Sequence, residues 1–156
     1  MITTDGYLYF IDRALDGMAE VLTGLGDDRA NRRPGPPGGN SPYALVTHCL
    51  GVVSFWGGQV VSGRDVARDR EAEFTATGSV DELVARLHAV REQFAADVAA
   101  AVPADPCRGV VPPKYRDTPI GRSQGMALQH VYEELAQHRG HLEATRDLLT
   151  AGEDRV

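Results

Sequence analysis

Residues 127–149 read ALQHVYEELAQHRGHLEATRDLL, and this stretch decides the fold. Its apolar residues recur at spacings of four and seven, which is typical of the buried face of an amphipathic helix: Val131, Leu135, Leu142 and Leu149. The pattern predicts a long helix that begins at Thr118-Pro119 or at Ser123 and ends near Thr150.

Three further segments have the same periodicity. They run from about Thr4 to Leu25, from Ser41-Pro42 to about Ser62-Gly63, and from Ser79 to the break at Pro103. No segment shows the sustained alternation of a strand, so we expect an all-α fold, a four-helix bundle with long crossover loops. We expect residues 1–156 to form a single domain. The charged residues 64–74 (RDVARDREAEF) predict either a short helix or an exposed arm.

Charge and composition exclude several classes of function. The chain has 22 acidic and 16 basic residues and a net charge of -6, which argues against nucleic acid as the main partner. The most apolar stretch, 45–61, contains His48, Gln59 and several glycines, and is therefore a poor membrane span. The N-terminal residues do not resemble a signal peptide. We therefore expect a cytoplasmic protein without a membrane or nucleic-acid partner.

Four polar side chains gather on the shoulder of the last helix's buried face, within an arc of roughly 80° at about 100° per residue: His130, Glu134, His138 and His141. Burying such groups unpaired would cost several kcal/mol in total, and a metal ion is an economical partner. Glu134 has the i,i+4 spacing with both His130 and His138, and His138 with His141 has the i,i+3 spacing. Imidazole and carboxylate suit zinc, nickel or iron rather than calcium or magnesium. The alternative for Glu134 and His138 is an ordinary solvated pair.

A third ligand should come from another helix, because a catalytic zinc usually has three protein ligands and an open position. His48 is the only histidine on an apolar stripe outside the last helix, although a hydrogen-bonded structural histidine is the alternative for it. His88 lies off the core positions of its helix and is expected to face solvent. Cys49, Cys107, Phe55 and Trp56 are interpreted as packing or loop residues rather than as nucleophiles or a substrate platform.

Three segments, taken in order, resemble a known family. They are PPGGNSPYALVTHCLGVVSFW (36–56), DREAEF (69–74) and HVYEELAQHRGHLEATRDLL (130–149). Together they are similar to the DinB-like metalloenzyme superfamily, in the branch of the mycothiol-dependent thiol S-transferases and maleylpyruvate isomerase. The resemblance implies a metal triad on His48, Glu134 and His138. It also implies that His130 and His141 are catalytic neighbours that orient ligands or bind substrate, and that Gly140 allows a close helix approach or a kink.

The resemblance implies a metal-dependent S-transferase. It would activate a low-molecular-weight thiol, mycothiol first, for attack on a small electrophile, with zinc as the first candidate metal and nickel or iron as alternatives. A homodimer is expected from the same resemblance. The alternatives are a DinB-like metal-dependent hydrolase or isomerase, and a non-enzymatic, stress-related helical metal-binding protein. The sequence shows neither a thiol-binding signature nor an electrophile pocket.

Overall fold

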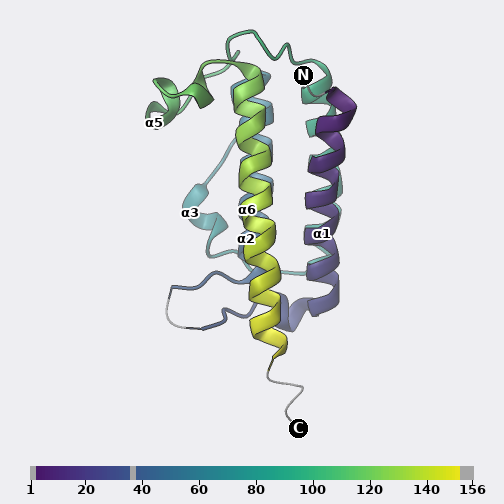
Figure 1. Cartoon of the computed structure of the whole chain (residues 1–156). Coiled ribbons are helices and arrows are strands. Elements are labelled where there is room, and N and C mark those ends of the chain that lie inside the picture. Colours follow the sequence, from purple (N-terminus) through teal and green to yellow (C-terminus); the bar gives the residue numbers. More distant parts are fainter. Residues whose placement is uncertain (1–2, 36–37, 152–156) are drawn as a thin grey trace.

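The computed structural model describes residues 3–35 and 38–151, and within them every regular element is a helix. The elements are α1 (Thr4–Ala30), α2 (Pro42–Val53), the π-helix η1 (Ser54–Val61), α3 (Arg70–Glu73), α4 (Val80–Ala99), α5 (Pro113–Arg116), the 3₁₀ helix η2 (Pro119–Gly121) and α6 (Gln124–Thr150). The long helices are α1, α2 continued by η1, α4 and α6, and they form a bundle (Figure 1). This confirms the predicted all-α class.

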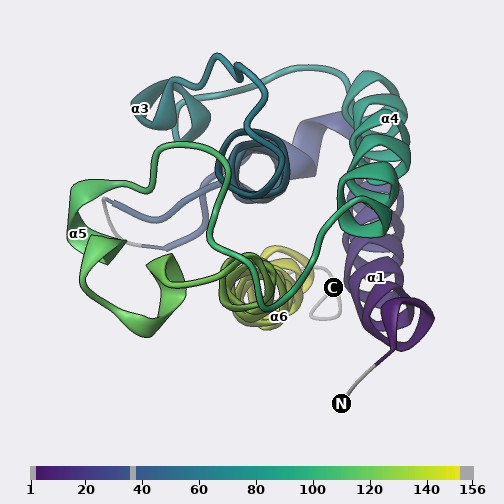
Figure 2. The same ribbon diagram turned by 90° about the horizontal axis from the view of Figure 1, so that it is seen from above.

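The long helices form a ring in which α1 and the α2–η1 helix each pack against both α4 and α6 (Figure 2). The start of α4 bonds to the end of α1, where the Val80 N–H donates to Asp27 Oδ1. The start of α6 lies beside the start of α1, where the Tyr7 hydroxyl donates to the Leu128 carbonyl. Helices α2 and α4 therefore run parallel to each other and antiparallel to α1 and α6.

Helix α1 is longer than the sequence predicts. Thr3 caps it by accepting a hydrogen bond from the Gly6 N–H, but the helix passes Gly24 and ends at Ala30 rather than near Leu25. Gly26 adopts φ +67°, a left-handed conformation that glycine reaches without steric cost. It produces a kink rather than a stop, because a further helical turn follows it.

The α2–η1 helix is the buried centre of the bundle. Ser41 accepts a hydrogen bond from the Ala44 N–H, Pro42 occupies the first turn, and Gly63 ends the helix at φ +74°, as predicted. Pro42–Val61 is the one described helical stretch long and apolar enough to span a membrane, with a mean hydropathy of 1.4. Inside the fold, 83% of that stretch is buried, which is typical of a core helix.

Helices α4 and α6 carry the remaining core. Helix α4 ends at Ala99, before the predicted break at Pro103, because the chain turns toward α6 and the Val102 N–H donates to the Gln124 side chain. Helix α6 begins at Gln124 with Ser123 as its cap, which is one of the two predicted starts. Its predicted apolar stripe is buried: Val131, Leu135, Leu142 and Leu149.

Two crossover segments cover one side of the bundle. Helix α3 lies in the connection from η1 to α4, and α5 lies in the connection from α4 to α6 (Figure 1). Both project from the side formed by α2 and α6, away from α1 (Figure 2). They therefore cover one side of the α2–η1 helix and of α6.

Candidate metal centre

The structure brings His48, Glu134 and His138 together across α2 and α6. Each offers one ligand atom, and these atoms all lie within 4.8 Å of one another. His48 Nε2 is 3.7 Å from Glu134 Oε2, and His138 Nε2 is 3.6 Å from the same oxygen. The two imidazole rings meet edge to face, with 4.9 Å between their centroids.

These separations fit a bound metal ion better than direct hydrogen bonds. A nitrogen–oxygen hydrogen bond spans about 2.7–3.2 Å, shorter than either contact to Glu134. Two ligands at about 2.0–2.2 Å from one tetrahedral zinc lie roughly 3.3–3.6 Å apart, close to the observed spacing. Two imidazole nitrogens and a carboxylate oxygen are also a donor set that zinc, nickel or iron accepts. The residues present therefore fit a divalent transition metal.

His48 is oriented by a buried carboxylate. Its Nδ1 lies 2.8 Å from Glu73 Oε2, and both side chains are almost fully buried. Arg68 binds the same carboxylate through two hydrogen bonds of 2.7 and 2.9 Å, and so balances its charge. When a metal ion is bound, Nδ1–H would donate to Glu73 and the Nε2 lone pair of His48 would be free to bind the ion. A carboxylate that fixes the far nitrogen of a histidine is a recurrent feature of metal sites.

Glycine makes this arrangement possible. Gly51 follows His48 by one helical turn, and a Cβ on Gly51 would overlap the Glu73 carboxylate. The short helix α3 brings Glu73 to this position, with Asp69 Oδ1 accepting hydrogen bonds from the Glu71 and Ala72 N–H groups. Of the two predictions for residues 64–74, the short helix is confirmed.

Glu134 is ionised at neutral pH. Its polar contact with His138, followed by that with His48, holds the pKa of this carboxyl well below its usual range, and these contacts outweigh the opposing effect of partial burial. An anionic carboxylate between two imidazoles is the charge state that a divalent cation requires.

The other histidines occupy different positions. His130 is buried, its Nε2 lies 3.7 Å from Glu134 Oε1, and its Nδ1 lies 3.1 Å from Glu133. His141 is exposed and stacks beside His138, with 6.3 Å between the ring centroids. His88 is exposed on α4, as predicted. Gly140 neither approaches another helix nor kinks α6, so that expectation is wrong: the helix is continuous, and a Cβ there would meet open space.

A cavity of about 310 Å³ opens beside the cluster. His48, Glu134 and His130 contribute to its wall from α2 and α6. Phe55 and Trp56 contribute from η1, where the wider π-helical turn changes which side chains face α6. The rest of the lining comes from the crossover segments: Arg68, Arg70, Pro112, Lys114 and Tyr115 with Val52 of α2.

Two aromatic residues of this cavity contact His130. The Trp56 ring lies edge to face with the His130 ring at 4.8 Å between centroids, and Tyr115 lies 5.0 Å from it. Trp56 is buried and Phe55 is partly buried, so both pack against the core, as predicted, and also line the cavity. These two residues therefore pack the core and also form part of the cavity wall, and the sequence predicted only the packing.

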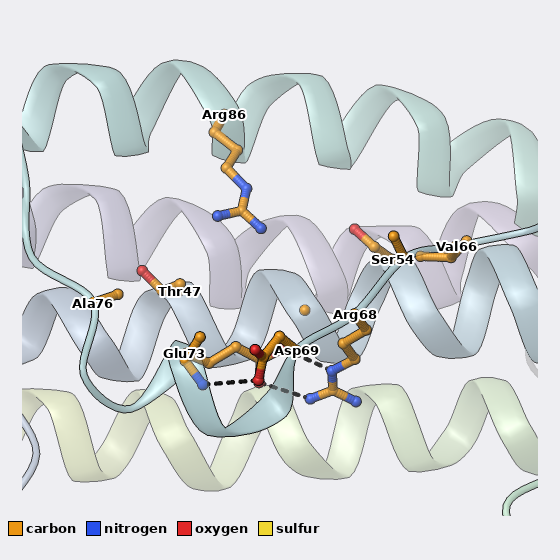
Figure 3. Close-up of a pocket in the computed structure, with 11 residues that line it drawn as sticks. Thr47, Ser54, Val66, Arg68, Asp69, Glu73, Ala76 and Arg86 are labelled. Atoms are coloured by element: carbon orange, nitrogen blue, oxygen red, sulfur yellow. Dashed lines mark hydrogen bonds and ion pairs between the residues drawn. The ribbon is translucent and has the colours of Figure 1, made fainter.

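A second cavity, of about 400 Å³, lies on the other side of Glu73. Thr47 and Ser54 of α2 and η1 form its floor, and Arg86 extends toward it from α4 (Figure 3). Arg68 and Glu73 form part of its wall (Figure 3), and Arg68 also lines the first cavity. The second cavity is not lined by His48, Glu134 or His138.

A family model described as mycothiol S-transferase matches residues 7–151. The chain belongs to the mycothiol S-transferase family. The match covers all four long helices and both crossover segments, and so includes the cluster and its cavity. A comparison with curated proteins gave no match.

Neither cysteine of this mycothiol S-transferase family member has an activating environment. Cys49 is buried, and burial raises the pKa of its thiol, as do the charges of Glu134 and Glu73. Burial also raises the pKa of Cys107. Since a nucleophilic cysteine needs a lowered pKa, neither thiol is in an activated state.

Sequence reasoning missed three features of the site: Glu73, Tyr115 and the cations Arg70 and Lys114. Glu73 is one of several charged residues in its segment and resembles the solvated ones. The available signal was Gly51, a glycine one turn after His48 in an otherwise apolar helix, which indicates that another group approaches closely. Tyr115 and Lys114 follow prolines in a loop without periodicity, and no pattern there indicates which side chains point inward.

Proposed function

We propose that this chain is a metal-dependent thiol S-transferase. His48, Glu134 and His138 hold a divalent transition metal, zinc first by the preference of the donor set, with nickel or iron as alternatives. The cavity receives a low-molecular-weight thiol, mycothiol, and a small electrophile. The observation that carries this proposal is the meeting of three ligand atoms within 4.8 Å at the wall of a cavity, in a member of the mycothiol S-transferase family.

The chemistry follows from the charges of the site. A divalent metal in this position would lower the pKa of a neighbouring thiol, so that the thiolate is present at neutral pH. The thiolate sulfur then forms a bond to the electrophilic carbon as the leaving group departs with its electron pair. His130 is suited to accept the thiol proton, since Glu133 binds its Nδ1 and its Nε2 faces the Glu134 side of the cavity.

His141 has a supporting role in this proposal. It lies outside the cavity lining, stacks beside His138 and is exposed. It therefore orients the His138 ring rather than contacting substrate. Its substitution is expected to weaken metal binding without abolishing it.

Conjugation of mycothiol to monochlorobimane tests the function. In this reaction a carbon–sulfur bond forms, the carbon–chlorine bond breaks, chloride leaves, and the thiol proton passes to His130 and then to solvent. We expect protein loaded with zinc to form the fluorescent conjugate, and His138→Ala to lose both the metal, by elemental analysis, and the activity. His88→Ala is the matched control, because it removes an exposed histidine on α4.

Two outcomes would contradict the proposal. Wild-type protein that binds zinc but forms no conjugate, while releasing chloride, would favour a metal-dependent hydrolase. Protein that binds no transition metal would favour a non-enzymatic helical module. The homodimer and the cytoplasmic location expected from the sequence stay predictions, and analytical ultracentrifugation tests the first.

A further inference from the structure

Two cations line the cavity without a carboxylate partner. Among the residues that the structure describes, Arg70 of α3 and Lys114 of α5 make neither an ion pair nor a hydrogen bond to an acidic side chain. The third cation of the cavity, Arg68, is different, because Glu73 binds it through two hydrogen bonds. Glu134 is the one carboxylate in the cavity lining, and its ion-pair contacts are with His48, His130 and His138. Arg70 and Lys114 are exposed and offer the cavity positive charge that no carboxylate of the lining binds directly.

Two cations at one cavity are unexpected in a chain that is acidic overall. The net charge is -6, and Lys114 is the only lysine. Arg70 and Lys114 come from the two separate crossover segments on the same side of the bundle (Figure 2). Unpaired cations at one cavity repel each other, and a bound anion removes that repulsion.

Each cation is also connected to a histidine of the site through one aromatic ring. The Arg70 guanidinium lies 5.1 Å from the Phe74 ring, which stacks on His48 at 4.6 Å. The Lys114 ammonium lies 4.4 Å from the Tyr115 ring, which contacts His130 at 5.0 Å. An anion bound by the two cations is therefore held one ring away from the candidate metal centre.

The remaining cavity wall suits a flat, apolar molecule. Phe55, Trp56 and Tyr115 contribute aromatic surface, and the volume of about 310 Å³ is that of a small-ligand site. We propose that the electrophilic substrate is a small planar or aromatic carboxylate. Arg70 and Lys114 bind its carboxylate, and the aromatic wall holds its ring. The term electrophile rests on the proposed function, but the binding of the carboxylate does not.

Trp56 reports binding directly, because it is the only tryptophan of the chain and lines the cavity. Full-length protein, with and without zinc, is titrated with benzoate or with its neutral analogue benzamide, and tryptophan fluorescence is recorded. A charge-assisted contact predicts a Kd for benzoate at least about tenfold below that for benzamide. The double variant Arg70→Met, Lys114→Met should remove this difference. Arg116→Met is the matched control, an exposed cation on α5 that does not line the cavity.

A second pair of probes tests catalysis. Phenacyl bromide and 4-(bromoacetyl)benzoate share the reacting carbon, where a carbon–sulfur bond forms, the carbon–bromine bond breaks, bromide leaves, and the thiol proton passes to solvent. We expect kcat/KM with mycothiol to be at least about tenfold higher for the carboxylate, and the double variant to remove that advantage.

The outcomes separate the two proposals. Equal Kd values for benzoate and benzamide, or benzoate binding that the double variant leaves unchanged, would overturn the carboxylate site even if conjugation occurs. Absence of conjugation with both bromides, together with the predicted difference in Kd, would overturn the S-transferase and leave the carboxylate site standing. Circular dichroism of the double variant establishes that its helices are intact.

Discussion

Glu73 Oε2 lies 2.8 Å from His48 Nδ1, so a residue of a four-residue crossover helix orients a ring at the centre of the bundle. Arg68 binds the other side of the same carboxylate. Arg68, Glu73 and His48 therefore form a row of hydrogen-bonded side chains, in which the charge of Arg68 balances that of Glu73 and His48 reaches the candidate metal centre. The crossover segment therefore takes part in the site rather than only connecting helices.

Glu73→Gln tests this row. The amide is a weaker acceptor for His48 Nδ1–H and lacks the charge that Arg68 neutralises, so the affinity for zinc should fall about 10- to 100-fold. Competition with a chromophoric chelator measures the affinity. Glu71→Gln, an exposed change in the same short helix, should leave it unaltered. An unchanged affinity in Glu73→Gln would mean that Glu73 only packs against His48.

Gly51→Ala tests the same relationship without altering a charge. The new Cβ would overlap the Glu73 carboxylate and displace it from His48. We expect a loss of zinc affinity of about the same size as in Glu73→Gln. Gly24→Ala is the matched control, because Gly24 lies in α1 and a Cβ there would meet open space. If Gly51→Ala binds zinc like the wild type, zinc binding does not require the Glu73 carboxylate to lie beside His48.

His130→Gln separates proton transfer from metal binding. His130 lines the cavity but lies outside the cluster of three ligand atoms, so the variant should keep its zinc. Loss of the proton acceptor should lower kcat for conjugation by roughly 10²-fold or more at neutral pH. Elemental analysis and steady-state kinetics on the same sample measure the two effects. Loss of zinc in this variant would instead make His130 a ligand.

We expect the wild type and Tyr7→Phe to differ in their free energy of unfolding, and the sign of the difference to change with pH. Burial raises the pKa of the Tyr7 hydroxyl above its ordinary value of about 10, so the folded state keeps a proton that the unfolded state releases at high pH. Below about pH 10 the wild type should be about 1 kcal/mol more stable, through the hydrogen bond to Leu128. Above it, this advantage should decline by about 1.4 kcal/mol per pH unit and vanish near pH 11.

Urea unfolding of both proteins, followed by circular dichroism at several pH values, checks this prediction. A constant difference between the wild type and Tyr7→Phe across the alkaline range would show that the hydroxyl ionises as readily in the folded state as in the unfolded chain.

The sequence was sufficient for the parts of the molecule that depend on helical periodicity. Leu135 and Leu142 predict the buried face of α6, and the spacing of Glu134 and His138 places their side chains on one side of that helix. The capping pattern Ser41-Pro42 predicts the start of α2. These are local properties, and a regular helix converts spacing directly into direction.

The remainder depends on tertiary contacts that periodicity does not encode. Gly26 kinks α1 instead of ending it, because the following turn bonds to the start of α4. Glu73 is buried only because a crossover segment folds back onto Gly51. Lys114 lines the cavity through the path of a proline-rich connection. Such loops are positioned by the helices that they join, and their own sequence carries little directional information.

Absorption spectroscopy of cobalt-substituted protein tests the central claim most directly. Cobalt(II) takes the place of zinc, and a thiolate that binds it produces an intense sulfur-to-metal charge-transfer band. Our account predicts that mycothiol produces this band in the wild type, that the band saturates, and that neither His138→Ala nor Glu134→Ala produces it. A protein that binds cobalt through these residues yet shows no charge-transfer band at saturating mycothiol would contradict the account.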